Sequence, residues 1–301
     1  MISKDKDDKL IRIYFLICEY FEELQYYCER FSNNNNPEFT DQEIMTIYLY
    51  VIHHQGHTKI KHIYRFADDY LRLWFPKLGS YQAFSKRLNR LDGAFNRLVE
   101  LLLRNYIPED CLFDQSLLDS MPIITCSGKR QAKVAKELTD KGYCSTKSMY
   151  YYGVKLHALG FRRLGTLPHP EQILLTPASV NDITVYKQAW AQIENRTFFG
   201  DKIYMDKALN QDMIANLNSE MMTPVKAVKG MNDVIKKRLK AADDLYSTAV
   251  SKVRQPIEAL FGWLIQKTEI QKASLVRSTK GLLVHTFGKL AAAFINLTFN
   301  S

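Results

Sequence analysis

The sequence predicts an all-α N-terminal region followed by an α/β domain with a mixed five-stranded sheet flanked by helices. Two changes along the 301 residues support this prediction. Up to about residue 107, apolar residues recur at intervals of three and four, as in Leu10, Ile13 and Ile17, which is helical spacing. After Pro108, runs rich in aromatic and β-branched residues appear and then alternate with helical patterns.

The first 110 residues contain the signals of several packed helices. Thr40, followed three residues later by Glu43, is the pattern of a capping box at a helix start. Two further helices are expected over 59–73 and 80–91, and the second has polar faces suited to lying against DNA. We therefore predict a helix-turn-helix-like DNA-binding domain over 1–110, although an ordinary solvated helix explains these residues equally well. The candidate DNA contacts on that helix are Lys86, Arg87 and Arg90.

The remainder of the chain, 111–301, is predicted to form the α/β domain. Strands are expected over 111–126, 149–159 and 172–176, and their short connections suggest an antiparallel arrangement. Helices over 182–193 and 208–217 then alternate with strands over 197–200 and 222–225, and long helices close the chain. This order indicates a sheet with both parallel and antiparallel neighbours.

The chain is basic, with 41 Lys+Arg against 32 Asp+Glu and a formal net charge of +9. This balance favours an anionic partner, although a basic surface can serve solubility alone. Much of the excess lies in two basic insertions, at 127–148 and 226–243, which are candidates for a phosphate-binding groove or for plain solvated surface. The candidate DNA contacts there are Lys129, Arg130, Lys236, Lys237 and Arg238.

The cysteines and the apolar segments indicate the cellular compartment of the protein. The five cysteines show no paired spacing, which is typical of a reducing compartment. The most apolar late stretch, 282–299, is interrupted by His285 and Lys289, so no membrane span is expected. We expect a cytoplasmic protein.

Three acids form the candidate catalytic set. Asp119 and Asp201 each end or interrupt an apolar, strand-like run, and Glu258 lies on a predicted helix four residues after Arg254. Two carboxylates about 4 Å apart repel by roughly 4 kcal/mol at an effective dielectric near 20, so such a cluster needs a cation. Oxygen ligands favour Mg²⁺ or Mn²⁺, and two such ions can promote cleavage or transesterification of a phosphodiester.

Five ordered segments resemble the DDE transposases of bacterial insertion sequences, whose catalytic domain has the ribonuclease H-like fold. Asp119 in LLDSMPI matches the aspartate of the first strand, Asp201 in FFGDKIYMD that of the fourth, and Glu258 in RQPIEALF the helical glutamate. Segments 152–157 and 176–182 are similar to the second and third strand signatures. The resemblance implies two Mg²⁺ or Mn²⁺ ions, double-stranded DNA as partner through terminal inverted repeats and a target, and a homodimer in the synaptic complex.

The late-helix motif departs from the family pattern at two places. Ser251 stands where some members have a tyrosine three residues before the motif arginine, and Ile265 stands where a lysine follows the glutamate, with Lys267 as the nearest basic residue. Pro256 predicts that the helix begins near Arg254 or is kinked there. Arg254 then either contacts DNA, orients Glu258 or forms a simple ion pair.

Residues near the three acids are further candidate members of the site. Lys155, His157 and Lys202 are candidates for DNA contact near the active site. Asp114 should point to the opposite sheet face, and Asp206 should cap the helix that begins near residue 208. Asp182 is expected to cap its own helix.

The sequence leaves three functions open. The favoured one is a transposase that cleaves DNA and transfers strands at the ends of an element. The second is a ribonuclease H-like nuclease without strand transfer. The third is a catalytically silent DNA-binding regulator, a reading that the presence of all three acids argues against.

Overall fold

The computed structural model describes residues 4–28, 37–225 and 233–299, and the side chains of 4–6 and 233–238 lie outside this description. By their contacts, residues 1–106, 132–137 and 264–301 form one compact unit, called unit 1, and residues 107–131 and 138–263 form a second, called unit 2. Residues 264–301, expected within the α/β domain, therefore pack with the N-terminal helices. The functional division at residue 110 stays a prediction.

Unit 1 is helical in its described part, as the apolar spacing predicted. Its helices are α1 Lys4–Glu19, α2 Phe21–Cys28, α3 Asp41–Gln55, α4 Ile60–Tyr70, α5 Tyr81–Leu88, α6 Asp92–Asn105, α10 Thr279–Leu283, the π-helical turn η2 Val284–Gly288 and α11 Lys289–Phe299. Thr40 and Glu43 form the predicted capping box at the start of α3. Residues 44–52 of α3 are buried on every side, so α3 is the central helix of this unit.

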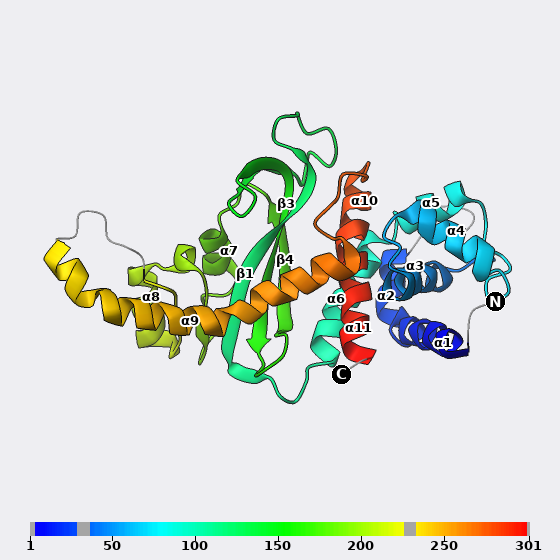
Figure 1. The fold of residues 1–301 in the computed structure, drawn as a ribbon. Coiled ribbons are helices and arrows are strands. Elements are labelled where there is room, and N and C mark those ends of the chain that lie inside the picture. Colours follow the sequence, from blue (N-terminus) through cyan, green and yellow to red (C-terminus); the bar gives the residue numbers. More distant parts are fainter. Residues whose placement is uncertain (1–3, 29–36, 226–232, 300–301) are drawn as a thin grey trace. The chain divides into compact units, whose positions relative to one another are not determined.

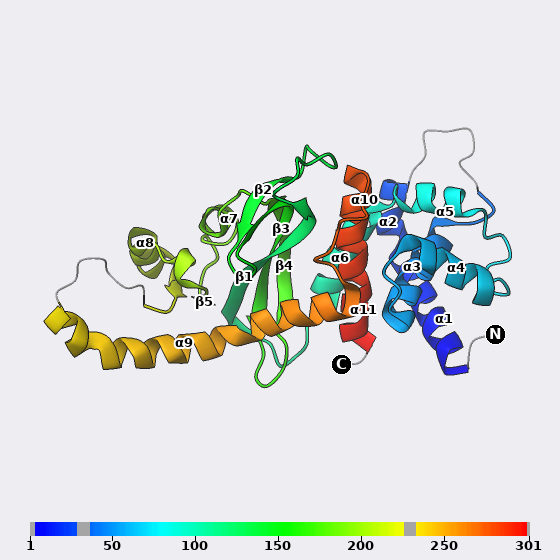
Figure 2. The same cartoon turned by 45° about the horizontal axis from the view of Figure 1, so that its top comes forward.

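The late apolar segment contributes to the same core. Helix α11 packs against α3 and α6, and Figures 1 and 2 both show α11 beside α6. Residues 279–299 are long and apolar enough to cross a membrane by composition, but 67% of the most apolar window is buried within the structure. Such burial is typical of a core helix in a water-soluble unit.

Unit 2 is built on a six-stranded mixed sheet. Its strands are β1 Leu112–Ser127, β2 Asp140–Cys144, β3 Met149–Arg162, β4 His169–Pro177, β5 Thr197–Phe199 and β6 Glu220–Met222. The central order is β3-β1-β5-β6; β3 is antiparallel to β1, and β5 is parallel to β1 and β6. On its other edge β3 pairs antiparallel with β2 at residues 149–153 and with β4 at 154–161.

This topology confirms the predicted ribonuclease H-like α/β fold. The number of strands differs from the prediction, because β2 lies inside the basic insertion 127–148 that we interpreted as a connector. Its five residues contain three polar or charged side chains, and pairing with β3 stabilises them as a strand despite that composition.

Helices cover the sheet of unit 2 and link the strands. They are α7 Asp182–Ala189, the 3₁₀ turn η1 Lys202–Tyr204, α8 Lys207–Leu217 and α9 Asp233–Thr268. Leu118 of β1 packs in one buried cluster with Trp190 and Phe198, and this cluster includes Met213 of α8. Figure 1 shows the long helix α9 crossing in front of β1. Since neighbouring strand residues point to opposite faces, Asp119 points to the face of the sheet opposite to that of Leu118.

Candidate active site

Asp119 lies in the middle of β1, opposite Ala158 of β3. Its Oδ1 accepts a hydrogen bond of 2.8 Å from the backbone N–H of Ser120, and its side chain is 22% exposed. Burial raises the pKa of Asp119 to about 6, and the negative charges of Glu258 and Asp182 act in the same direction. The ionised form of this carboxylate is therefore costly without a nearby cation.

Arg254 provides that cation in the present structure. Its guanidinium Nη1 donates to Asp119 Oδ2 at 3.1 Å, and its Nη2 donates to Glu258 Oε1 one helical turn later on α9. The guanidinium thus bridges the first and third predicted acids. Arg254 Nε is buried and has no hydrogen-bond partner among the described residues.

Helix α9 runs without interruption from Asp233 to Thr268 and contains Pro256. The predicted helix start near Arg254 is therefore wrong. Proline removes one backbone hydrogen bond and strains an α-helix, and the rest of this 36-residue helix outweighs that local cost. The continuous helix places Arg254 and Glu258 on the face that meets β1.

Asp201 follows β5 and caps the turn η1. Its Oδ1 accepts from the backbone N–H of Lys202 at 2.7 Å, and the side chains of Asp201 and Lys202 are exposed. Gly200 precedes it, and a Cβ there would come within 2.8 Å of the Tyr204 ring. A glycine at this position lets the ring of Tyr204 pack at the end of β5.

Tyr204 links the three acidic segments electrostatically. The residue is 1% exposed, and burial raises the pKa of its phenol well above the ordinary value. The negative charges of Asp182, Asp119 and Asp201 raise this pKa further, each by less than burial does. The phenol is therefore near all three carboxylates. Its hydroxyl has no hydrogen-bond partner within the described part of the chain. The sequence showed Tyr204 only as part of the Asp201 motif, without a role.

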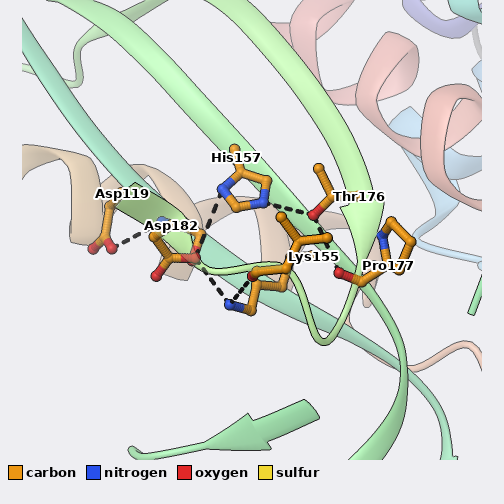
Figure 3. A network of polar contacts seen from close by, with 8 residues as sticks. Asp119, Lys155, His157, Thr176, Pro177 and Asp182 are labelled. Atoms are coloured by element: carbon orange, nitrogen blue, oxygen red, sulfur yellow. Dashed lines mark hydrogen bonds and ion pairs between the residues drawn. The ribbon is translucent and has the colours of Figure 1, made fainter. Parts of the chain in front are cut away.

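Asp182 is a fourth carboxylate at this site, and its predicted role as a helix cap was wrong. Asn181 is the N-cap residue of α7, and Asp182 Oδ1 instead accepts from Lys155 Nζ at 2.9 Å. Figure 3 shows the Asp182 carboxylate lying between Asp119 and the side chains of Lys155 and His157. These residues meet only because β3 pairs with its neighbouring strands. Spacing along the chain therefore could not predict the contact of Asp182 with Lys155 and His157.

Lys155 and His157 are fixed rather than free. Lys155 Nζ also donates to the Val180 carbonyl at 2.7 Å, so one of its three N–H groups is left for another partner. His157 is fully buried, its Nε2 lies 2.8 Å from Thr176 Oγ1, and its Nδ1 lies 3.8 Å from Asp182 Oδ1. Burial lowers the pKa of His157 to about 4, which keeps the ring neutral at pH 7.

The other predicted DNA contacts come from several segments of the chain. Lys129 and Arg130 are exposed after β1, and Lys86 and Arg90 are exposed on or just after α5. Arg87 is held by the Asp41 carboxylate at 2.7 Å and by the Phe39 carbonyl, so it stabilises unit 1. The side chains of Lys236, Lys237 and Arg238 lie outside the described residues.

The donor set fits a divalent cation chemically. Within the described residues, no three His, Cys, Asp or Glu side chains are close enough together to hold a metal ion. Asp119, Asp201 and Glu258 nevertheless offer carboxylate oxygens only, and the raised pKa of Asp119 shows a local need for positive charge. Arg254 meets that need for Asp119 and Glu258, whereas Asp201 accepts from the backbone N–H of Lys202 at the end of β5 and does not share this bridge.

Comparison with known proteins identifies the family of the chain. Searches of curated proteins and of solved structures gave no match. A family model described as "Transposase DDE domain" matches residues 114–292, which is more than half of the 301 residues and spans all three predicted acids. The chain therefore belongs to the transposase DDE domain family.

Proposed function

We propose that this protein cleaves DNA at the ends of a mobile element and joins those ends to a target. The single observation that supports this most is the bridge from Asp119 on β1 through Arg254 to Glu258 on α9, within a domain of the transposase family. The bridge brings together two acids that lie 139 residues apart in the sequence. A merely structural ion pair at the surface would not require a second acid from so distant a segment.

Asp119, Asp201 and Glu258 would hold Mg²⁺ or Mn²⁺, with two ions as the family resemblance implies. Bound divalent cations supply charge stabilisation to the phosphoryl oxygens and make a water or a 3′-hydroxyl a better nucleophile. Displacement of Arg254 from the carboxylates would then free its guanidinium for a DNA phosphate, for which its planar donor fork is well suited.

The chain's own basic residues would position the DNA. Lys155, fixed by Asp182 and the Val180 carbonyl, would direct its remaining N–H toward a phosphate beside Asp119. His157 is neutral and buried, so its role would be to support Asp182 rather than to contact DNA. The other candidates are expected to contact the backbone. Five of them are exposed, and they are Lys202, Lys129, Arg130, Lys86 and Arg90; the side chains of Lys236, Lys237 and Arg238 lie outside the described residues.

The remaining features follow from the family and stay proposals. The helical N-terminal region would bind terminal inverted repeats, a homodimer would hold two ends together, and the protein would act in the cytoplasm on DNA of the nucleoid. The basic net charge of +9 supports such a polyanionic partner.

Strand transfer separates the proposal from its alternatives. The protein is incubated with a duplex carrying the terminal repeat and with a supercoiled plasmid, in Mg²⁺ or Mn²⁺. Joined products support a transposase. Nicked DNA without joined products supports a ribonuclease H-like nuclease, and DNA binding without nicks or joined products supports a silent regulator.

Variants of the three acids test the site itself. Asp119→Asn, Asp201→Asn and Glu258→Gln should each lower cleavage on the order of a thousandfold, because several kcal/mol of transition-state stabilisation are lost. Asp114→Asn, on the same strand but exposed, is the matched control and should cleave normally. Binding of Mn²⁺ measured by electron paramagnetic resonance should weaken in the three variants and not in the control.

A further inference from the structure

A second charged site lies wholly within unit 1, apart from the acids of unit 2. It is a pocket of about 720 Å³ lined by residues at the start of α4, by α5 and by residues 269–289. Tyr81 and Ser85 of α5, together with its C-cap residue Asn89, follow one another at intervals of four and form one wall. This volume is in the range of pockets that bind small ligands.

The lining of the pocket is strongly cationic. Its basic side chains come from three separate segments and are Lys59, Lys61, Lys272, Arg277 and Lys289. Among the described lining residues Glu269 is the one acid. The Thr58 hydroxyl donates to Glu269 at 2.7 Å and lowers the pKa of that carboxyl, so Glu269 is ionised and is already hydrogen-bonded.

Lys289 is the buried member of this set. The residue is 2% exposed, and its ammonium donates a long hydrogen bond of 3.4 Å to the Glu269 backbone carbonyl. Burial lowers the pKa of Lys289 to about 7, which the negative charge of Glu269 offsets only in part. A buried ammonium with one weak carbonyl partner is costly, since its remaining N–H groups have lost water.

The neighbouring imidazole of His285 supplies no negative charge to the Lys289 ammonium. His285 Nε2 donates to the Ile270 carbonyl at 2.7 Å, and burial lowers the pKa of that imidazole to about 3, so the ring is neutral. An anion with several acceptor oxygens would satisfy both the ammonium and the hydroxyls of Ser274 and Ser278 that line the same pocket.

We propose that this pocket binds a phosphate group, with Lys289 at its base and Arg277 and Lys61 at its exposed rim. The phosphate belongs either to the backbone of a bound DNA strand or to a free phosphate compound. Carboxylates are weaker candidates, because they offer fewer oxygens to cations that come from three directions. The site goes beyond the proposed cleavage reaction and does not depend on it.

Phosphate binding is measured on the full chain without divalent metal, by calorimetry with inorganic phosphate and pyrophosphate against chloride of equal ionic strength. The wild-type protein should bind both anions and melt at a higher temperature in their presence. Lys289→Met should bind at least tenfold more weakly and yet melt no lower than wild type in chloride. Lys280→Met, an exposed lysine of α10 outside the pocket, is the matched control and should behave as wild type.

Two results would overturn the proposal: wild-type protein that prefers neither anion to chloride, or a folded Lys289→Met variant that binds them undiminished. If Lys289→Met does not fold, Arg277→Met tests the same pocket from its exposed rim and should also weaken binding. Because no cleavage is measured, failure here is distinct from failure of the proposed transposase activity.

A labelled duplex distinguishes the two sources of phosphate. If the ligand is the DNA backbone, inorganic phosphate should compete with the duplex beyond the effect of chloride, and Lys289→Met should reduce the salt dependence of duplex binding by about one charge. If duplex binding is unchanged in Lys289→Met while anion binding is lost, the ligand is a free phosphate compound.

Discussion

Asp119 in unit 2 and Lys289 in unit 1 are both ionisable side chains that are largely buried from water, but they differ in the partner that the fold provides for the charge. Burial moves both toward their neutral forms, with the pKa of Asp119 raised to about 6 and that of Lys289 lowered to about 7. Asp119 receives a guanidinium from Arg254, whereas Lys289 receives a backbone carbonyl at 3.4 Å. The fold supplies a counter-ion in the first case and leaves the charge to a ligand in the second.

The difference has a thermodynamic consequence. Breaking a partly buried ion pair leaves a charge without compensation and destabilises the fold, whereas replacing an unpaired buried charge by an apolar side chain removes a penalty. A buried charge that reduces stability is a candidate for function. Stability measurements on single variants can therefore test the comparison.

The largest effect is expected for Lys289→Met, which should raise the free energy of unfolding by a few kcal/mol at pH 7. The folded chain binds fewer protons than the unfolded chain between about pH 7 and pH 10.5, the ordinary pKa of lysine, so wild-type stability rises with pH through this window. The advantage of the variant should thus be full at and below pH 7 and should vanish near pH 10.5.

Urea unfolding at pH 7 and pH 9.5 measures this gain, and Lys280→Met should change stability by less than about 0.5 kcal/mol. A Lys289→Met protein that is less stable than wild type at pH 7 would show that attraction to Glu269 compensates the ammonium. Lys289 would then have a compensating charge in the fold, as Asp119 has, and the proposed difference between the two residues would be wrong.

The next effect is expected for Arg254→Met, which should lower stability by about 2 kcal/mol, because Asp119 and Glu258 lose their shared counter-charge. The loss is modest because the Glu258 side chain is 52% exposed and water partly compensates its charge. Mg²⁺ or Mn²⁺ should restore the melting temperature of this variant more than it raises that of wild type, since the cation replaces the guanidinium.

Thermal melts with and without divalent ions measure that rescue. Arg12→Met is the matched control, because its pair with Asp8 is exposed on both sides and should contribute less than about 1 kcal/mol. Equal effects of the ions on Arg254→Met and on Arg12→Met would argue against a cation site at the acids.

A smaller effect is expected for Asp182→Asn, which removes the charge that fixes Lys155 while preserving the size of the side chain. We expect a loss of about 1 kcal/mol in stability and about tenfold in DNA cleavage, the rate effect of 1.4 kcal/mol. Asp206→Asn is the matched control, because asparagine also caps helices and Asp206 pairs with the partly exposed Lys187. Cleavage that falls equally in both variants would remove the special role of Asp182.

The smallest effect on stability is expected for Tyr204→Phe. Because the hydroxyl has no partner in the described residues, its removal should leave the melting temperature unchanged or raise stability by up to about 1 kcal/mol. Cleavage should fall severalfold, since the hydroxyl lies near Asp119, Asp201 and Asp182, where bound DNA or water needs a donor. Full activity in this variant would limit Tyr204 to packing.

Much of the fold was predictable because its signals are local. The capping box of Thr40 and Glu43, the Asp206 cap of α8 and the strands β1 and β3 depend on nearby residues and on the spacing of apolar side chains. β2 was missed, since its polar residues become a strand only when β3 supplies hydrogen bonds. Of the two alternatives at Pro256, the helix start near Arg254 was wrong, because the rest of the 36-residue helix outweighs the local cost of the proline.

The sequence by itself determined the α/β class and the family resemblance, and it predicted Asp119, Asp201 and Glu258 as the catalytic acids, because these inferences depend on residue type and order. Only the tertiary structure decided that Arg254 bridges two of these acids, that Asp182 pairs with Lys155, and that Lys289 lies buried in a cationic pocket. The physical reason is that the cost of a charge depends on its distance from water and from other charges, and folding sets those distances between residues far apart in the chain.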